Sequence, residues 1–322
     1  MKTNNVLQGD CLEVLKTIPD RVIDCCITSP PYYGLRDYGC DGQIGLEKTP
    51  EEFIQKLVDV FHEVKRVLKD DGTLWLNIGD SYWGSGSRGY DFTDKWSDAS
   101  KVQSNSKGTE NLSNIPKLVG TTDTGIKNKD LIGIPWMLAF ALRKDGWYLR
   151  QDIIWHKPNP MPESVKDRCT KSHEYIFLLS KKPHYYFDYE AIQEQAITGE
   201  TIRDKNAEGY QADYPNGQRF SAGSHVYAKN GMRNKRDVWS ITTKAVREAH
   251  FATYPEELVK PCILAGSRVG GVILDPFFGS GTTGRVAVSL NREYIGIELN
   301  PEYIEIADRR TDNVQMSFLG MI

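Results

Sequence analysis

The sequence has no apolar run long enough to cross a membrane, and its first ten residues, MKTNNVLQGD, lack the apolar segment of a secretory signal. Its six cysteines include no C-x-x-C pair and follow no metal-site spacing. We therefore expect a cytoplasmic protein with reduced thiols, without a bound metal and without a membrane partner. A strong net charge is also lacking, since 40 Lys and Arg stand against 43 Asp and Glu. With 322 residues, the chain is long enough for one large globular domain or two smaller ones.

Positive charge is instead concentrated in one stretch. Between residues 201 and 247 there are nine Lys or Arg (positions 203, 205, 219, 229, 233, 235, 236, 244 and 247) and four Asp or Glu (positions 204, 208, 213 and 237). Such an excess is typical of a surface that faces phosphate groups, but it also occurs in solvated loops. Charge alone leaves both interpretations open.

Helix and strand patterns alternate through most of the chain. The run VIDCCI, from Val22, is typical of a buried strand. The segment after Thr49 is typical of a helix, because Thr49 and Glu52 form a capping box and apolar residues recur at helical spacing. We expect Gly72 to end this helix and a strand to follow it. Similar patterns occupy residues 131–146, 147–157, 173–182 and the chain after 237, which predicts an α/β fold.

Two irregular stretches interrupt this alternation. Residues 82–129 are polar, rich in Gly and Ser and aperiodic, which is typical of a lid or a mobile insertion. Residues 189–237 are irregular as well and coincide with the basic excess. We therefore expect a main domain of residues 1–188 and 238–322, with a separate region at 189–237 inserted into it.

The segment VILDPFFGSGTTG predicts a nucleotide-type binding site. An apolar strand that ends at Leu274 leads into a G-x-G-x-x-G pattern that begins at Gly279, and a helix and a second strand follow. Glu298 lies at the end of that second strand, nineteen residues after Gly279. In such a βαβ unit the glycines let a ligand approach the backbone, the helix start offers unpaired N–H groups, and the acid is placed to bind a ribose. A tight structural turn is the alternative interpretation of the glycines.

The segment TSPPY, directly after the first predicted strand, ends that strand with a stiff backbone. Pro30 and Pro31 fix φ and offer no N–H, so no neighbouring strand can continue the pairing. The Ser29 hydroxyl and the Pro30 carbonyl are acceptors suited to the N–H groups of an amine, and Tyr32 is suited to stack on a flat ring. Taken alone, these residues are better explained as a strand terminator. Beside the glycine-rich site, the chemical interpretation is favoured.

Together, TSPPY and DPFFGSGTTG resemble the amino-methyltransferases of DNA. The motif order resembles that of their β class, in which the catalytic segment precedes the cofactor-binding segment. The resemblance covers most of the chain and includes the segments HEYIFLLSKKPHYYFD, RDVWSI and HFATYPEELVKPCILAGS. It implies a doubly wound, mostly parallel Rossmann-like sheet with permuted motif order, and an inserted target-recognition region at residues 189–237.

The resemblance also implies roles for single residues. It implies S-adenosyl-methionine as cofactor and a base flipped out of double-stranded DNA as substrate. Catalysis would fall to Ser29, Pro30, Pro31 and Tyr32. Cofactor contacts would come from Asp10, Pro255, Asp275, Phe277, Gly279, Gly281, Thr282 and Glu298. DNA contacts would come from Arg36, Arg233, Lys235 and Arg236.

Several alternatives stay open at this point. In the resembled family Ser-Pro-Pro-Tyr mostly accompanies methylation of cytosine N4, and Asp-Pro-Pro-Tyr that of adenine N6. We therefore favour cytosine N4, with adenine N6 as the alternative. Two other classes are a non-catalytic DNA-binding protein with a relict cofactor fold and a nicotinamide-dependent oxidoreductase, which would leave TSPPY unexplained. Asp10 also suits a helix N-cap, and Arg36 a surface turn. A homodimer and a partner restriction endonuclease are left open by the resemblance.

Overall fold

The computed structural model describes residues 2–84, 125–196, 231–243 and 254–319, together with the backbone of short strands between residues 201 and 227. Most of the insertion expected at 82–129 therefore lies outside the described residues. The chain divides into two compact units, Met1–Phe187 with Asp237–Ile322 and, separately, Asp188–Arg236. Among the described residues, no helix is both long enough and apolar enough to span a bilayer.

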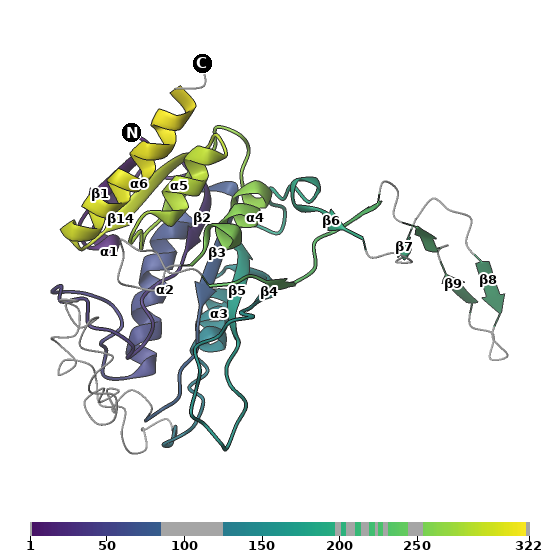
Figure 1. Cartoon of the computed structure of the whole chain (residues 1–322), viewed down its shortest axis with the longest axis horizontal. Coiled ribbons are helices and arrows are strands. Elements are labelled where there is room, and N and C mark those ends of the chain that lie inside the picture. The colour runs from purple at the N-terminus through teal and green to yellow at the C-terminus, as the bar shows by residue number, and fades with distance from the viewer. Residues whose placement is uncertain are drawn as a thin grey trace, which may run out of the picture. The chain divides into compact units, whose positions relative to one another are not determined.

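The first unit is built on one eight-stranded sheet with the strand order β1-β14-β13-β2-β3-β5-β4-β12 (Figure 1). Its strands are β1 (Asn5–Gln8), β2 (Ile23–Thr28), β3 (Leu68–Ile78), β4 (Tyr148–His156), β5 (His173–Ser180), β12 (Val238–Ser240), β13 (Val272–Asp275) and β14 (Glu293–Glu298). β5 pairs antiparallel with β3 and β4, and the other neighbouring strands run parallel. The mostly parallel sheet predicted from the sequence is therefore confirmed.

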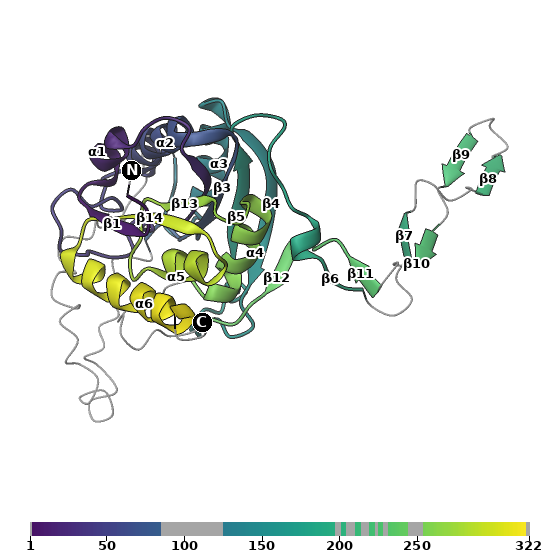
Figure 2. The same cartoon turned by 90° about the horizontal axis from the view of Figure 1, so that it is seen from above.

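Helices cover both faces of this sheet, as a doubly wound fold requires (Figure 2). One face carries α1 (Cys11–Thr17), α2 (Pro50–Val67) and α3 (Ile134–Lys144), and the other carries α4 (Glu256–Gly266), α5 (Thr282–Ser289) and α6 (Pro301–Leu319). The main core lies between the first face and the sheet, where large side chains such as Phe53, Phe61, Leu74 and Phe177 are fully buried.

The connections change direction between β2 and β13, which are parallel neighbours. β2 leads through α2 to β3 on one side, whereas β13 leads through α5 to β14 on the other. In such sheets the loops beyond the carboxyl ends of the strands open a crevice for a ligand at this switch point. Ser29 directly follows β2 and Pro276 directly follows β13. The two motifs recognised in the sequence therefore come to the same edge of the sheet.

Helix α2 begins where the sequence predicts but ends earlier. The Thr49 hydroxyl accepts a hydrogen bond from the N–H of Glu52 at 3.2 Å, which caps the helix as expected. The last helical residue is Val67. Gly72 does not end the helix but lies within β3, where an added Cβ would meet the carbonyl oxygen of Asp24 at 3.1 Å. Glycine at this position therefore allows the backbone of β3 to pass close to that of β2.

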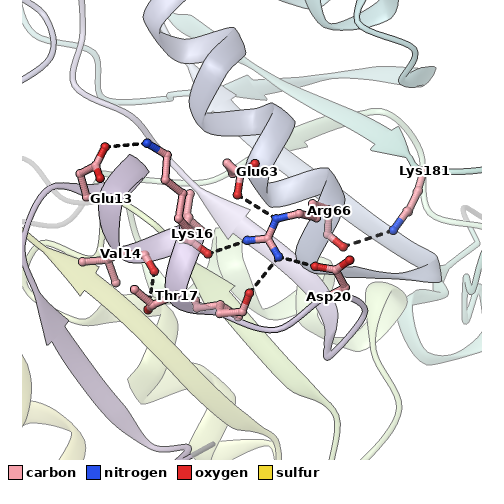
Figure 3. A network of polar contacts seen from close by, with 10 residues as sticks. Glu13, Val14, Lys16, Thr17, Asp20, Glu63, Arg66 and Lys181 are labelled. Carbon is pink, nitrogen blue, oxygen red and sulfur yellow. Dashed lines mark hydrogen bonds and ion pairs between the residues drawn. The ribbon is translucent and has the colours of Figure 1, made fainter.

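Arg66, on the last turn of α2, joins this helix to α1 (Figure 3). Its guanidinium donates to the carbonyl oxygens of Leu15 and Ile18 at 2.8 and 2.9 Å, where α1 ends and helix carbonyls lack partners within the helix. The carboxylates of Asp20 and Glu63 accept from the same guanidinium. These charge-assisted bonds fix the position of α1, whose first turn contributes to the site described below.

The second unit contains short antiparallel strand pairs where the sequence predicts irregular structure. After a 3-10 turn, η2 (Glu190–Ile192), β6 (Glu194–Gln195) pairs with β11 (Met232–Arg233), β7 (Thr201–Arg203) with β10 (His225–Tyr227) and β8 (Tyr210–Asp213) with β9 (Arg219–Ala222). Strands of two to four residues are too short for an apolar period to be recognised in the sequence. The expectation of irregular structure is wrong for these segments.

Candidate active site

A cavity of about 350 Å³ opens at the carboxyl edge of the sheet in the first unit. Four of the segments that line it lie at the ends of strands, namely residues 9–11 after β1, 29–32 after β2, 276–280 after β13 and 298–300 at the end of β14. The volume falls in the range of about 300–1,000 Å³ that is common for small-ligand pockets. The glycine-rich motif and the Ser-Pro-Pro-Tyr motif therefore line one shared cavity.

The three glycines of the G-x-G-x-x-G pattern have different surroundings. Gly279 and Gly281 both have left-handed backbones, with φ of +53° and +80°. A Cβ added at Gly279 meets nothing within 4 Å, and Gly279 lines the cavity. A Cβ at Gly281 would lie 2.8 Å from that of Ala307 in α6, and one at Gly284 would lie 2.6 Å from the ring of Phe278. Within this pattern, Gly279 leaves room for a ligand, while the other two glycines allow close internal packing.

Two carboxylates, those of Glu298 and Asp10, line the cavity near this loop. Glu298 accepts hydrogen bonds from the N–H groups of Gly279 and Asn300, both at 2.8 Å, which ties the glycine loop to the end of β14. Burial raises the pKa of Glu298, and the backbone hydrogen bonds act in the opposite direction. One oxygen of Asp10 accepts from the N–H of Glu13 at 3.1 Å, so Asp10 is the N-cap of α1 as well as a cavity residue. A role of either carboxylate in cofactor binding stays a prediction.

Asp275 is fully buried and holds the walls of the cavity together. Its carboxylate accepts from the hydroxyls of Thr28, Thr283 and Tyr254 at 2.6, 2.6 and 2.8 Å. It also accepts from the N–H of Phe277 at 3.1 Å. Burial raises the pKa of Asp275, and the hydrogen bonds from these partners act in the opposite direction. A carboxylate that already serves four donors is placed to fix β2, β13, α5 and the start of α4 relative to one another.

The structure does not bring all predicted cofactor contacts to the cavity. Asp275 lies behind its wall, Pro255 forms the N-cap of α4 while its neighbour Tyr254 reaches the cavity, and Gly281 faces α6. These three residues do not line the cavity. The remaining five predicted contacts do, namely Asp10, Phe277, Gly279, Thr282 and Glu298.

The predicted catalytic segment is far from the glycine loop in the chain order but lines the same cavity. Ser29, Pro30, Pro31 and Tyr32 are all lining residues. The phenol of Tyr32 donates a hydrogen bond to Glu174 at 2.6 Å. Its ring lies so close to Gly79 that a Cβ there would come within 2.6 Å of Cε2 of the ring. The position of the Tyr32 ring is therefore fixed by contacts at both its hydroxyl and its edge.

Three polar residues beside Tyr32 were not found by sequence reasoning. Glu174, Asn77 and Lys157 line the cavity from β5, β3 and the residue after β4. Glu174 accepts from the Asn77 amide at 3.3 Å and forms an ion pair with Lys157. No short motif joins residues from three separate strands. The one signal in the sequence was a carboxylate at the start of the apolar run HEYIFLLS.

The residues predicted to bind DNA lie in two places. Arg36 lines the cavity together with Tyr38 and Tyr303. Arg233 and Lys235 belong to the second unit, where both form ion pairs with Glu194, at 2.9 and 3.7 Å. Arg236 is exposed in that unit. Much of the positive charge of Arg233 and Lys235 is thus balanced inside the second unit, and DNA contact by any of these residues stays a prediction.

One cavity at the edge of this Rossmann-like sheet joins the glycine loop to Ser-Pro-Pro-Tyr, as the resemblance to DNA amino-methyltransferases implies. The chain belongs to the DNA methylase family of N6 and N4 methyltransferases, whose model matches residues 23–309. It is therefore a DNA methyltransferase of the amino type, and the nicotinamide-dependent oxidoreductase is no longer an alternative.

Curated relatives agree with this assignment. The chain is 48% identical over 305 residues to the Type II methyltransferase M.Cfr9I of Citrobacter freundii, covering 95% of this chain and 86% of the relative. It is 47% identical over 310 residues to the Type II methyltransferase M.SmaI of Serratia marcescens, covering 96% of this chain and 91% of the relative.

Two solved structures share the fold at low sequence identity. The PvuII DNA methyltransferase, described as cytosine-N4-specific, matches with a TM-score of 0.62 and 16% identity over 98% of this chain and 91% of its own. A putative DNA modification methylase of Thermus thermophilus, in complex with S-adenosyl-L-methionine, matches with a TM-score of 0.57 and 23% identity over 96% of this chain and 93% of its own.

Proposed function

We propose that the chain transfers a methyl group from S-adenosyl-methionine to the exocyclic N4 amine of a cytosine flipped out of double-stranded DNA. The observation that carries this proposal is the shared cavity, which is lined by the glycine loop and Glu298 and also by Ser29, Pro30 and Tyr32. A methyl donor and an acceptor amine bound at these two groups of residues would lie in one enclosed space. Holding both reactants together is itself a large part of catalysis.

The residues around the glycine loop fit the cofactor. Its adenosine offers an amine and ribose hydroxyls as donors, for which the Asp10 and Glu298 carboxylates are acceptors. Phe277 offers a ring beside the same space, and Gly279 leaves that space open. When bound, S-adenosyl-methionine supplies a methyl group that is activated by a positively charged sulfur. Asp10, Phe277, Gly279 and Glu298 are the residues that would hold it.

The role of the Ser-Pro-Pro-Tyr segment in this proposal is to hold the amine of the target base. An exocyclic base amine is a poor nucleophile because its lone pair is delocalised into the ring. Acceptors aimed at its N–H groups favour a pyramidal nitrogen whose lone pair can attack. The Ser29 hydroxyl and the Pro30 carbonyl are such acceptors on a backbone that the prolines keep stiff. Tyr32 offers its ring to the base once the base has left the duplex.

The preference for cytosine over adenine rests on Ser29. A serine hydroxyl is neutral and short, whereas the adenine-type pattern has a carboxylate at this position. A neutral acceptor suffices because the amine carries no net charge before attack. The positive charge that develops during transfer is shared with the Pro30 carbonyl. Adenine N6 is the second candidate, because the same segment can accept from any exocyclic amine.

The nucleoside product tests this proposal. DNA from a methylation-deficient host is incubated with the protein and S-adenosyl-methionine, digested to nucleosides and analysed by mass spectrometry against standards. We expect N4-methylcytosine. The matched variant Ser29→Ala should form the same nucleoside at a rate lower by about 10²-fold, the cost of one lost preorganised polar contact. N6-methyladenine would overturn the choice of base, and 5-methylcytosine or no methylated base would overturn the proposed function.

The second unit is proposed as the region that recognises the DNA sequence. Its support is the basic excess between residues 201 and 247 and its place as an insertion between β5 and β12. The high identity to proteins named Type II methyltransferases supports a partner restriction endonuclease. A homodimer remains a prediction from the sequence.

A further inference from the structure

Glu174 lines the cavity, but its carboxylate takes no direct part in the proposed reaction. Its side chain is 13% exposed. Oε2 accepts from the Tyr32 phenol at 2.6 Å and from the Asn77 amide at 3.3 Å, and Oε1 forms the ion pair with Lys157. The two oxygens thus serve three donors. Because charged hydrogen bonds are stronger than neutral ones, a carboxylate held in this way has one orientation.

The partners of Glu174 are themselves held by the sheet. The Asn77 amide also donates to the carbonyl of Tyr175 at 3.1 Å, across the β3–β5 pair. The Lys157 ammonium lies 4.3 Å from the centre of the Trp155 ring, which adds a cation–π contact. Trp155 and Glu174 are paired residues in the β4–β5 ladder. Glu174 and Asn77 are therefore strand residues, and Lys157 directly follows the strand beside them.

Tyr32 is the link between this network and the predicted catalytic segment. Burial and the Glu174 carboxylate raise the pKa of Tyr32 well above its usual value, while hydrogen bonding with the Ser29 hydroxyl acts in the opposite direction. The phenol therefore stays protonated and donates to Glu174. The edge of its ring is limited by Gly79. The orientation of Glu174 therefore determines that of the Tyr32 ring, which would touch the target base.

We propose that Glu174 is a positioning residue of the active site, which holds the Tyr32 ring in place before DNA binds. The inference rests on the proposed function and deepens it. A ring that is already in place needs no ordering when the base arrives, so we expect the gain in the rate of methyl transfer rather than in binding.

The experiment compares methyl transfer at enzyme excess over unmethylated plasmid DNA, scored as the methylated nucleoside. Tyr32→Phe and Glu174→Ala should each slow transfer by about 10- to 100-fold, the size expected from a misplaced reacting group. Glu174→Gln keeps an acceptor for the phenol and should retain more activity than Glu174→Ala. Affinities for S-adenosyl-methionine and for DNA, and the unfolding temperature of Tyr32→Phe, should stay at their wild-type values.

A double variant and a matched control complete the test. Tyr32→Phe combined with Glu174→Ala should be no slower than the slower single variant, because both changes remove the same hydrogen bond. Asp145→Ala is the control, since Asp145 is similarly buried at 19% exposure, lies 3.0 Å from Nδ1 of His62 and is outside the cavity. It should transfer methyl groups at the wild-type rate.

Two results would overturn the inference. One is a wild-type rate for Tyr32→Phe, which decides the matter even where Glu174→Ala does not fold. The other is a double variant whose losses multiply, which would mean that Glu174 acts independently of Tyr32. Absence of any methylated amine with the wild-type protein would instead overturn the proposed function, so the two failures are distinguishable.

Discussion

At the scale of single residues, Gly279 and Gly281 show how differently one residue type is used. Both have left-handed φ values, which cost an L side chain about 1–2 kcal/mol. At Gly281 a side chain would in addition collide with Ala307 of α6. At Gly279 it would meet no protein atom and would instead occupy space beside the cavity. We therefore predict that Gly279 is needed for ligand binding and Gly281 for the stability of the fold.

We expect Gly281→Ala to lower the free energy of unfolding by about 3 kcal/mol and Gly279→Ala by only about 1 kcal/mol, because overpacking adds to backbone strain at Gly281 alone. For S-adenosyl-methionine binding the order should reverse, with Gly279→Ala the weaker binder. Denaturant unfolding and calorimetric titration of the pair measure both quantities. Equal stability of the two variants would contradict the packing role of Gly281.

The residues of the candidate site were predictable where they stand in contiguous motifs. Ser29, Tyr32, Gly279 and Glu298 each lie at or after the end of a strand, and parallel strands bring their ends together by topology. Glu174 could not be found in this way, because its partners come from β3 and from the segments after β4 and β2, and no spacing in the sequence encodes their meeting.

At the scale of elements, Asp275 at the end of β13 connects this strand by hydrogen bonds to the elements around it. Its carboxylate accepts from Thr28 at the end of β2, from Tyr254 before α4 and from Thr283 in α5. An asparagine at this position has one acceptor oxygen and would direct an amide donor at hydroxyls that now donate. The change therefore affects four elements at once while adding no volume.

We expect Asp275→Asn to lower the free energy of unfolding by about 1–3 kcal/mol, the cost of buried hydrogen-bonding groups left without partners. The exposed carboxylate variant Asp59→Asn on α2 should change it by no more than about 0.5 kcal/mol. Chemical denaturation of both variants at pH 7 tests this. A loss at Asp275 no larger than at Asp59 would show that the hydroxyls find other acceptors.

Because the pKa of Asp275 is raised in the folded protein, the contribution of this residue to the free energy of unfolding depends on pH. A carboxyl whose folded pKa lies above its unfolded pKa contributes stability at acidic pH that is lost as pH rises through the folded pKa. Asp275→Asn lacks this contribution. The difference in stability between wild type and variant, measured by chemical denaturation at both pH values, should therefore be larger near pH 3.8, the ordinary pKa of Asp, than at pH 7.

Elements with a long apolar period were predicted well, and elements set by tertiary contacts were not. The start of α2 follows from its capping residues and was predicted, whereas its end at Val67 depends on the pairing of Leu68 with Ile23 in the neighbouring strand. The short strand pairs of the second unit lie below the length at which periodicity is informative.

At the scale of the whole molecule, the distribution of charge is more informative than its sum. Within the second unit, residues 201–236 hold seven Lys or Arg against three Asp or Glu, in a chain whose net charge is −3. Within that unit Glu194 pairs with both Arg233 and Lys235. Glu194 is thus placed to moderate the attraction of this region to phosphates.

We expect neutralising Arg233, Lys235 and Arg236 together to weaken DNA binding and to flatten its dependence on salt, because fewer counterions are released on binding. Glu194→Gln, in the same unit, should have the opposite effect on affinity. Fluorescence anisotropy with duplex DNA over a salt series measures both, and S-adenosyl-methionine binding should be unchanged. If the triple variant keeps the wild-type salt slope, this surface does not face phosphates.

The switch between β2 and β13 has a consequence for how the protein is made. The hydrogen bond from Thr28 to Asp275 spans 247 residues, and β1 pairs with β14 near the other end of the chain. On the ribosome, the predicted catalytic segment therefore emerges long before the strands that complete its cavity. Because a chain is synthesised from its N-terminus, a partly translated polypeptide carries Ser-Pro-Pro-Tyr without a cofactor pocket. We therefore expect a product truncated before β13 to lack methyltransferase activity.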